Sequence, residues 1–133
     1  MITESPFIVF SAERSELSDE ANHDRTKLLG GALTSRGIEW QSVAGFYDGR
    51  PETSFLVFAQ EGDASADQIE RLARHYDQES ILYVDAQRLA YLLVLKEGRT
   101  IELGKFKEIP KSELRATRAY TKVGERYYAT AVV

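Results

Sequence analysis

The sequence contains no cysteine, and this absence removes several kinds of chemistry at once. Without thiols the chain has no disulfide, no thiolate nucleophile and no cysteine-based zinc site. It also lacks any apolar run near the roughly 20 residues that cross a bilayer, and the first residues do not show the charged-then-apolar layout of a signal peptide. We therefore expect a cytoplasmic protein without a membrane partner.

Basic residues are also fewer than acidic residues. The chain has 17 basic and 21 acidic residues, which gives a formal net charge of -4. A protein that neutralises phosphates needs a basic surface, so nucleic acid is disfavoured as a partner. The 133 residues fit a single domain, 1–133, of ordinary globular composition.

The common signatures of cofactor and metal chemistry are missing as well. The sequence has no G-x-x-x-x-G-K motif, no G-x-G-x-x-G turn and no G-x-S-x-G elbow. Its two histidines, His23 and His75, lie on predicted helices, and neither has a second ligand at metal-binding spacing. We expect no metal site.

Hydrophobic periodicity predicts an alternation of strands and helices. Strands are predicted over residues 6–12, 38–47, 54–59, 80–84, 89–95 and 100–106, helices over 18–35 and 65–76, and a last hairpin around Gly124. The first six elements read strand, helix, strand, strand, helix, strand. This order predicts a ferredoxin-like α/β sandwich of the α+β class, βαββαβ with extra β-hairpins at the C-terminal end.

Two details of this prediction concern packing. Gly30 and Gly31 lie inside the first helix, where each costs about 1 kcal/mol relative to Ala, so we expect them to allow close approach of the helix to the sheet. The strand at 38–47 is expected to be half-buried, with one face formed by Ile38, Trp40, Ala44 and Phe46.

Polar side chains gather where the predicted strands end: Ser11, Arg14, Tyr47, Glu52, Gln78 and Glu79. Strand ends and loops are where a rigid scaffold presents functional groups. From spacing alone, however, solvated turn and cap residues explain each of them at least as well.

Several segments resemble small bacteriophage enzymes that destroy S-adenosylmethionine (SAM). The similarity lies in residues 10–22 (FSAERSELSDEAN), 45–52 (GFYDGRPE), 77–83 (DQESILY), 106–111 (FKEIPK) and 120–127. Together these segments cover most of the chain. The sequence thus resembles the SAM lyases, a family whose members have also been named SAM hydrolases.

The resemblance implies a fold, a reaction and an assembly. It implies a sandwich similar to the nitrogen-regulatory PII (GlnB) proteins, assembled as a homotrimer with active sites between subunits. SAM would be the substrate, with no cofactor, and the products would be 5'-methylthioadenosine and L-homoserine lactone, formed when the methionine carboxylate attacks Cγ. Such an enzyme would deplete SAM in the cytoplasm of an infected host, as counter-defence against restriction-modification.

The resemblance also assigns roles to individual residues. Glu52 and Tyr47 would be catalytic, Gln78 and Glu79 would hold adenine or ribose, and Ser11 and Arg14 would also bind substrate. Glu20 and Asn22 belong to the same similar segment, although helix capping explains them nearly as well.

Other functions stay open at this point. One is a PII-like module that binds SAM or an adenine nucleotide without catalysis. Another is an anti-restriction protein that binds the host enzyme directly, which the modest charge makes less attractive. A third is a hydrolase that forms homoserine with solvent water.

Overall fold

The computed structural model describes residues 6–47, 49–58 and 65–130, without the side chains of Ser65, Arg115 and Ala116. Asp48 lies outside this range, as does Ala59 at the end of the strand predicted over 54–59. In chain order the elements are β1 (Phe7–Phe10), α1 (Asp19–Ser35), β2 (Gln41–Tyr47), β3 (Arg50–Phe58), α2 (Ser65–His75), β4 (Ser80–Val84), β5 (Leu89–Val94), β6 (Arg99–Ile109), the 3-10 helix η1 (Lys111–Ala116), β7 (Ala119–Val123) and β8 (Arg126–Thr130).

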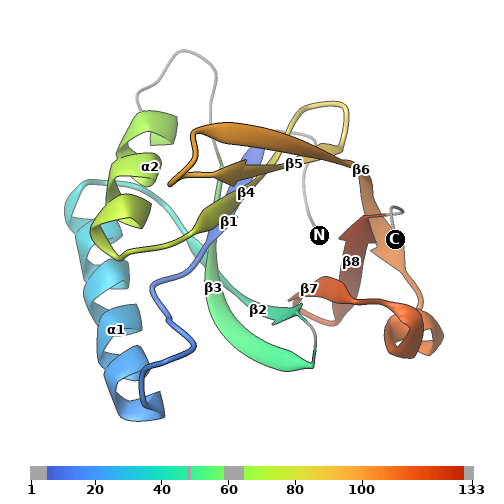
Figure 1. Ribbon diagram of the computed structural model, residues 1–133, viewed down its shortest axis with the longest axis horizontal. Coiled ribbons are helices and arrows are strands. Elements are labelled where there is room, and N and C mark those ends of the chain that lie inside the picture. Colours follow the sequence, from blue (N-terminus) through green and yellow to red (C-terminus); the bar gives the residue numbers. More distant parts are fainter. Residues whose placement is uncertain (1–5, 48, 59–64, 131–133) are drawn as a thin grey trace.

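The strands form a closed antiparallel barrel in the order β1-β3-β2-β7-β8-β6-β5-β4. Both α-helices lie on the same side of this barrel, and β7 and β8 lie on the side away from them (Figure 1). The predicted ferredoxin-like α/β sandwich, and with it the PII-like fold, is therefore wrong. The order of the first six elements was predicted correctly, but the sheet does not stop there.

The C-terminal strands are the reason that the sandwich prediction fails. β5 pairs with β4, and β7 pairs with β2, so the later strands extend the sheet from both of its edges. β6 and β8 pair with each other and complete the circle. Closure leaves none of the described strands at an edge, which removes the tendency of edge strands to pair with other chains.

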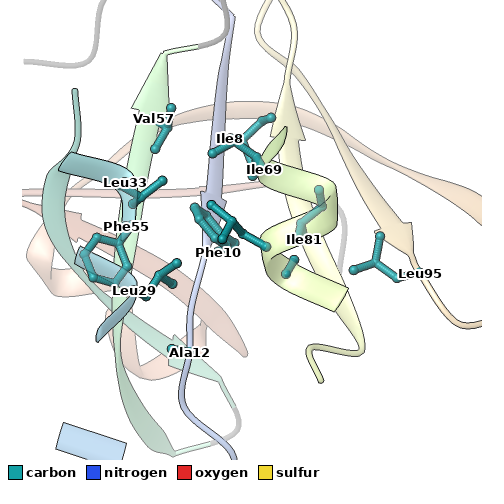
Figure 2. Packing of buried hydrophobic residues seen from close by; sticks show 12 residues of the cluster. Ile8, Phe10, Ala12, Leu29, Leu33, Phe55, Val57, Ile69, Ile81 and Leu95 are labelled. Atoms are coloured by element: carbon teal, nitrogen blue, oxygen red, sulfur yellow. The ribbon is translucent and has the colours of Figure 1, made fainter. Parts of the chain in front are cut away.

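Alternation along the strands produces two hydrophobic cores. On β1, Phe7 and Val9 point into the barrel, whereas Ile8 and Phe10 point towards the helices. The barrel-interior core also contains Val43, Leu56, Val84, Ala90, Phe106, Val123 and Tyr128. The helix-side core brings Leu29 and Leu33 of α1 and Ile69 of α2 onto the outer face of β1, β3 and β4 (Figure 2).

Local signals fix both ends of α1. Ser18 is the N-cap, and its Oγ accepts a hydrogen bond from the Ala21 N–H at 3.1 Å. At the other end Gly37 adopts φ +72°, a left-handed conformation that glycine adopts without strain and that ends the helix. Among the described residues, no helix combines the length and the apolarity needed to cross a membrane.

The two glycines of α1 differ in their surroundings. A Cβ at Gly30 would lie 3.3 Å from the Trp40 ring and 3.5 Å from the Phe55 ring, which confirms the predicted close approach of helix to sheet. A Cβ at Gly31 would meet nothing within 4 Å, so for Gly31 the prediction is wrong. Only at Gly30 would a side chain lie tightly against its neighbours.

This difference predicts opposite outcomes for two matched substitutions. Gly31→Ala is expected to raise the free energy of unfolding by about 0.5 to 1 kcal/mol, because it removes backbone entropy from the unfolded chain at no steric cost. Gly30→Ala is expected to gain less or to destabilise, because the Trp40 ring must shift. Urea unfolding of both variants tests this, and equal gains at the two positions would contradict it.

The strand predicted at 38–47 is shorter than expected and faces differently. β2 begins at Gln41, and Val43 is its buried residue, pointing into the barrel. Ala44 is exposed, and Phe46 stacks on Tyr120 of β7 with 4.9 Å between ring centroids. The predicted apolar face thus packs partly against a neighbouring strand on the outside of the barrel.

Candidate active site

The loop after β1 continues the contact with β3 through side chains. The backbone ladder between the two strands ends at the pair Phe10 and Phe55. Beyond it, Ser11 Oγ donates to the Thr53 carbonyl at 2.8 Å, and the Thr53 N–H donates to Glu13 Oε2 at 2.8 Å. Ser11 Oγ also accepts the Glu13 N–H at 3.0 Å. Both backbone groups of Thr53, the neighbour of Glu52, are therefore held by this loop.

The first turns of α1 hold the same loop in place. Asn22 is buried, and its Oδ1 accepts the Arg14 N–H at 2.8 Å while its Nδ2 donates to the Arg14 carbonyl at 2.9 Å. One amide side chain thus satisfies both backbone groups of Arg14, as a neighbouring strand would. Asn22 thus holds the loop that precedes α1 instead of capping the helix, whose N-cap is Ser18.

A second set of contacts ties the loop to the connection between α2 and β4. Arg25 donates from Nε to the Ala12 carbonyl at 2.6 Å and from Nη2 to the Tyr76 carbonyl. Gln78 Nε2 donates to the Glu13 carbonyl at 2.9 Å. Three segments that are distant in the sequence, after β1, at the start of β3 and before β4, therefore meet at one end of the barrel.

Arg14 and Glu79 lie at the edge of this region. Arg14 donates from Nη1 to the Asp77 carbonyl and from Nε to Glu16, and the hydrogen bond to Glu16 is the main cause of a raised pKa of Arg14. The Glu79 carboxylate acts on Arg14 more weakly through its charge, and its side chain is exposed. Arg14 and Glu79 are thus near enough to each other for their charges to interact.

Glu52 is a half-buried carboxyl group near the start of β3. Its side chain shares a face of the strand with Ser54 and Leu56, and Leu56 belongs to the barrel-interior core. Burial raises the pKa of Glu52, and the negative charge of Glu13 raises it further. Arg50 and a hydrogen bond from Ser54 oppose this rise, with Ser54 Oγ 3.5 Å from Glu52 Oε1. The residue directly across on β2 is Gly45, which places no side chain against the carboxyl group.

Tyr47 lies diagonally across the β2–β3 hairpin from Glu52. It follows Gly45 by two residues, so its side chain leaves β2 on the same face. The ring is 57% exposed, and the Arg118 guanidinium lies 5.2 Å from its centroid. The β2–β3 hairpin therefore brings the two residues predicted to be catalytic to one face.

Four of the six predicted site residues are thus connected by the loop network, namely Ser11, Arg14, Gln78 and, through Thr53, Glu52. Tyr47 joins Glu52 by strand register, and Glu79 follows Gln78 in the chain and acts on Arg14 through its charge. Their roles in binding and catalysis stay predictions. Ser11 is 2% exposed, and its hydroxyl already donates one hydrogen bond and accepts another.

Two residues of this region, Glu13 and Arg25, were not predicted from the sequence. Glu13 accepts from Thr53, and its charge acts on Glu52. Arg25 lies on α1, where a charged side chain usually faces solvent, and no local pattern shows that it bridges two loops. One feature of the sequence could have indicated Glu13, namely its place directly after the first predicted strand, between Ser11 and Arg14.

Of two hollows on the described surface, one lies away from the site and the other borders it at Thr53. An open hollow of about 460 Å³ is lined in part by Arg88, Phe106 and Tyr128, at the barrel end opposite to Glu52. A second hollow, of about 290 Å³, lies over β2 and β7 beside Thr53. In the described part of the chain, no group of three or more His, Cys, Asp or Glu side chains is placed to share a metal ion.

A carboxyl group with a perturbed pKa, placed where several strand ends converge, is a common feature of enzyme active sites. Comparison with known proteins gives the enzyme class. The sequence model of the S-Adenosylmethionine lyase family matches residues 8–131. The chain belongs to this family, and it is an enzyme that cleaves SAM. No curated protein matches the chain significantly.

Proposed function

We propose that the protein converts SAM into 5'-methylthioadenosine and L-homoserine lactone, by attack of the methionine carboxylate on Cγ of the same molecule. The observation that carries the proposal is Glu52, a half-buried acid with a raised pKa at the converging strand ends of a SAM lyase family member. The alternative of a non-catalytic binding module loses its basis, because the family is one of enzymes.

The chemistry of SAM requires little from the protein. The sulfonium is a leaving group that departs as a neutral thioether, and the methionine carboxylate is a nucleophile in the same molecule. Ring closure to a five-membered lactone brings the two together, and well-oriented intramolecular reactions reach effective molarities of about 10⁵ to 10⁸ M. The protein then has to fold the methionine chain so that the carboxylate lies in line with the Cγ–S bond.

The predicted residues fit such a positioning role. Glu52 would accept hydrogen bonds from ribose hydroxyls or face the sulfonium, and Tyr47 would form one wall for the reacting chain. Gln78 and Glu79 would contact adenine or ribose, and Ser11 and Arg14 would act mainly by holding the loop that borders the ligand. Opposite charges disappear as the lactone forms, so a partly dehydrated site favours the transition state.

The raised pKa of Glu52 predicts a pH dependence. If the ionised form binds the substrate productively, kcat/KM for SAM falls as the pH falls through this pKa. Because burial and Glu13 both disfavour the charged form, the acid limb is expected above the value of about 4.3 for an ordinary Glu. A profile of initial rates from pH 4 to 8 measures it, and an acid limb that is unchanged in Glu52→Gln would contradict the assignment.

Product analysis tests the reaction itself. Incubation of SAM with the protein is followed by NMR, with ¹⁸O-enriched water as solvent. We expect methylthioadenosine and lactone to accumulate in proportion to enzyme concentration, without solvent oxygen bound to Cγ. Homoserine that appears before lactone and carries ¹⁸O at Cγ would show a hydrolase instead.

We further propose a homotrimer with the active sites between subunits. The exposure of Tyr47 supports it, since this ring needs further cover to wall a pocket. Light scattering after gel filtration should give three times the mass of the 15.0 kDa chain. A fully active monomer would contradict this assembly.

The proposed biological role is depletion of SAM as counter-defence against restriction-modification in an infected host. Methylating and SAM-dependent restriction enzymes would lose their substrate, without direct contact with this protein. Production of wild type or Glu52→Gln in cells that carry a restriction-modification system distinguishes SAM depletion from direct inhibition of the restriction enzyme. Protection by wild type alone supports depletion, and equal protection by the inactive variant would support direct inhibition.

A further inference from the structure

Glu13 is unusually well fixed for a residue in a loop. Its N–H donates to Ser11 Oγ at 3.0 Å, its carbonyl accepts from Gln78 Nε2 at 2.9 Å, and its Oε2 accepts the Thr53 N–H at 2.8 Å. Backbone and side chain are both held, by partners from three parts of the chain. The position of this carboxylate is therefore set by the fold.

The same residue is an electrostatic neighbour of Glu52. Its negative charge acts on the half-buried Glu52 carboxyl group, and the cation that faces Glu52 in return is Arg50. Keeping two like charges close is unfavourable unless a cation balances them. An arrangement that holds the second acid rigidly beside the first is therefore suited to a ligand that brings positive charge.

We propose that Glu13 is a second acidic side chain of the SAM site, which positions the segment carrying Glu52 and makes the site prefer the charged sulfonium over uncharged thioethers. This inference rests on the proposed function, because it assigns Glu13 to the same site. SAM carries two positive centres, the sulfonium and the α-ammonium group, and one carboxylate. Two acids near the sulfonium favour its positive charge, whereas the product methylthioadenosine, a neutral thioether, is not held by charge and can leave.

Two analogues that are not substrates for lactone formation separate charge from shape. S-adenosylhomocysteine has a neutral sulfur, and sinefungin has a primary ammonium group in place of the methylsulfonium. Calorimetry gives the affinity of each for wild type and Glu13→Gln. The Gln amide oxygen still accepts the Thr53 N–H, so this substitution removes the charge and keeps the hydrogen bond.

We expect Glu13→Gln to bind S-adenosylhomocysteine as wild type does and to bind sinefungin about 10-fold more weakly, the effect of losing one partly screened charge pair. Glu13→Asp, which keeps the charge, should recover part of the preference. Glu39→Gln is the matched control, because Glu39 is exposed and lies far from Glu13. The two residues are at opposite ends of α1, whose 17 residues span about 25 Å. The ratio of the affinities of Glu39→Gln for sinefungin and S-adenosylhomocysteine should equal that of wild type.

The pH profile gives a second readout that a purely structural role would not change. Without the Glu13 charge Glu52 ionises more easily, so the acid limb of kcat/KM in Glu13→Gln should move to lower pH, with Arg50 and Ser54 unchanged. An unaltered preference for sinefungin together with an unaltered acid limb would overturn the inference. Wild-type protein that leaves SAM intact would instead refute the proposed function, and the binding preference would still decide the role of Glu13.

Discussion

Replacement of Glu52 with Gln is expected to lower kcat/KM for SAM by about 100-fold or more. The substitution keeps the size of the side chain but removes the charge, and thereby weakens every hydrogen bond in which the carboxylate accepts. In a reaction that depends on alignment, a displacement of about 1 Å is enough for a loss of this size. Initial rates of methylthioadenosine formation, measured by chromatography, give the value.

The same variant should be at least as stable as wild type. The pKa of Glu52 is raised in the folded protein, so between the unfolded and folded pKa values the folded state binds more protons. Stability therefore falls as the pH rises through this interval, and Gln removes that penalty at neutral pH. A loss of activity with unchanged or increased stability separates a functional role from misfolding.

Glu102→Gln is a suitable control for this experiment. Glu102 is an exposed acid on β6, and the change removes the same charge from another strand of the barrel. Its activity should remain within about twofold of wild type, because isolated surface charges contribute little. If Glu52→Gln also retained wild-type kcat/KM, Glu52 would have no part in the reaction.

The fold was predictable only as far as local patterns reach. Turn signals and periodicity indicated the first six elements, because short-range backbone preferences determine them. Barrel closure depends on pairings between distant segments, such as Ala44 with Lys122 and Phe106 with Thr130, for which many partners satisfy the same alternation. On the outer face of the barrel, Phe46 stacks on Tyr120. The presence of an aromatic residue in β2 therefore did not indicate which face of the strand points into the barrel.

The site was predictable in part for a similar reason. Residues at strand ends are visible in a sequence, and the resemblance singled out Glu52 and Tyr47 among them. Arg25 was missed because its partners are the carbonyl groups of Ala12 and Tyr76, and any residue type carries a carbonyl group. A hydrogen bond to a backbone carbonyl does not constrain which residue type carries that carbonyl, so the sequence does not reveal it.

Asn22 provides the second large expected effect, this time on stability. Asn22→Ala leaves the Arg14 N–H without its partner and removes one of two donors to the Arg14 carbonyl, which still accepts the Leu17 N–H at 3.1 Å. A buried polar group left unpaired costs about 1 to 3 kcal/mol. We therefore expect the free energy of unfolding to fall by about 1 to 3 kcal/mol. Urea unfolding monitored by circular dichroism measures the change. The variant should also lose activity at temperatures where it remains folded, because Glu13 lies in the loop that Asn22 holds in place.

Asn22→Asp distinguishes this structural role from a role in binding substrate. Asp keeps the oxygen that accepts the Arg14 N–H but places a second oxygen against the Arg14 carbonyl, so its stability should lie between those of wild type and the Ala variant. Its negative charge lies in the first turns of α1, where the helix dipole favours it. If Asn22 acts through the loop alone, activity follows stability across the three proteins. An Asp variant as stable as wild type yet as inactive as Glu52→Gln would instead place Asn22 in contact with the substrate.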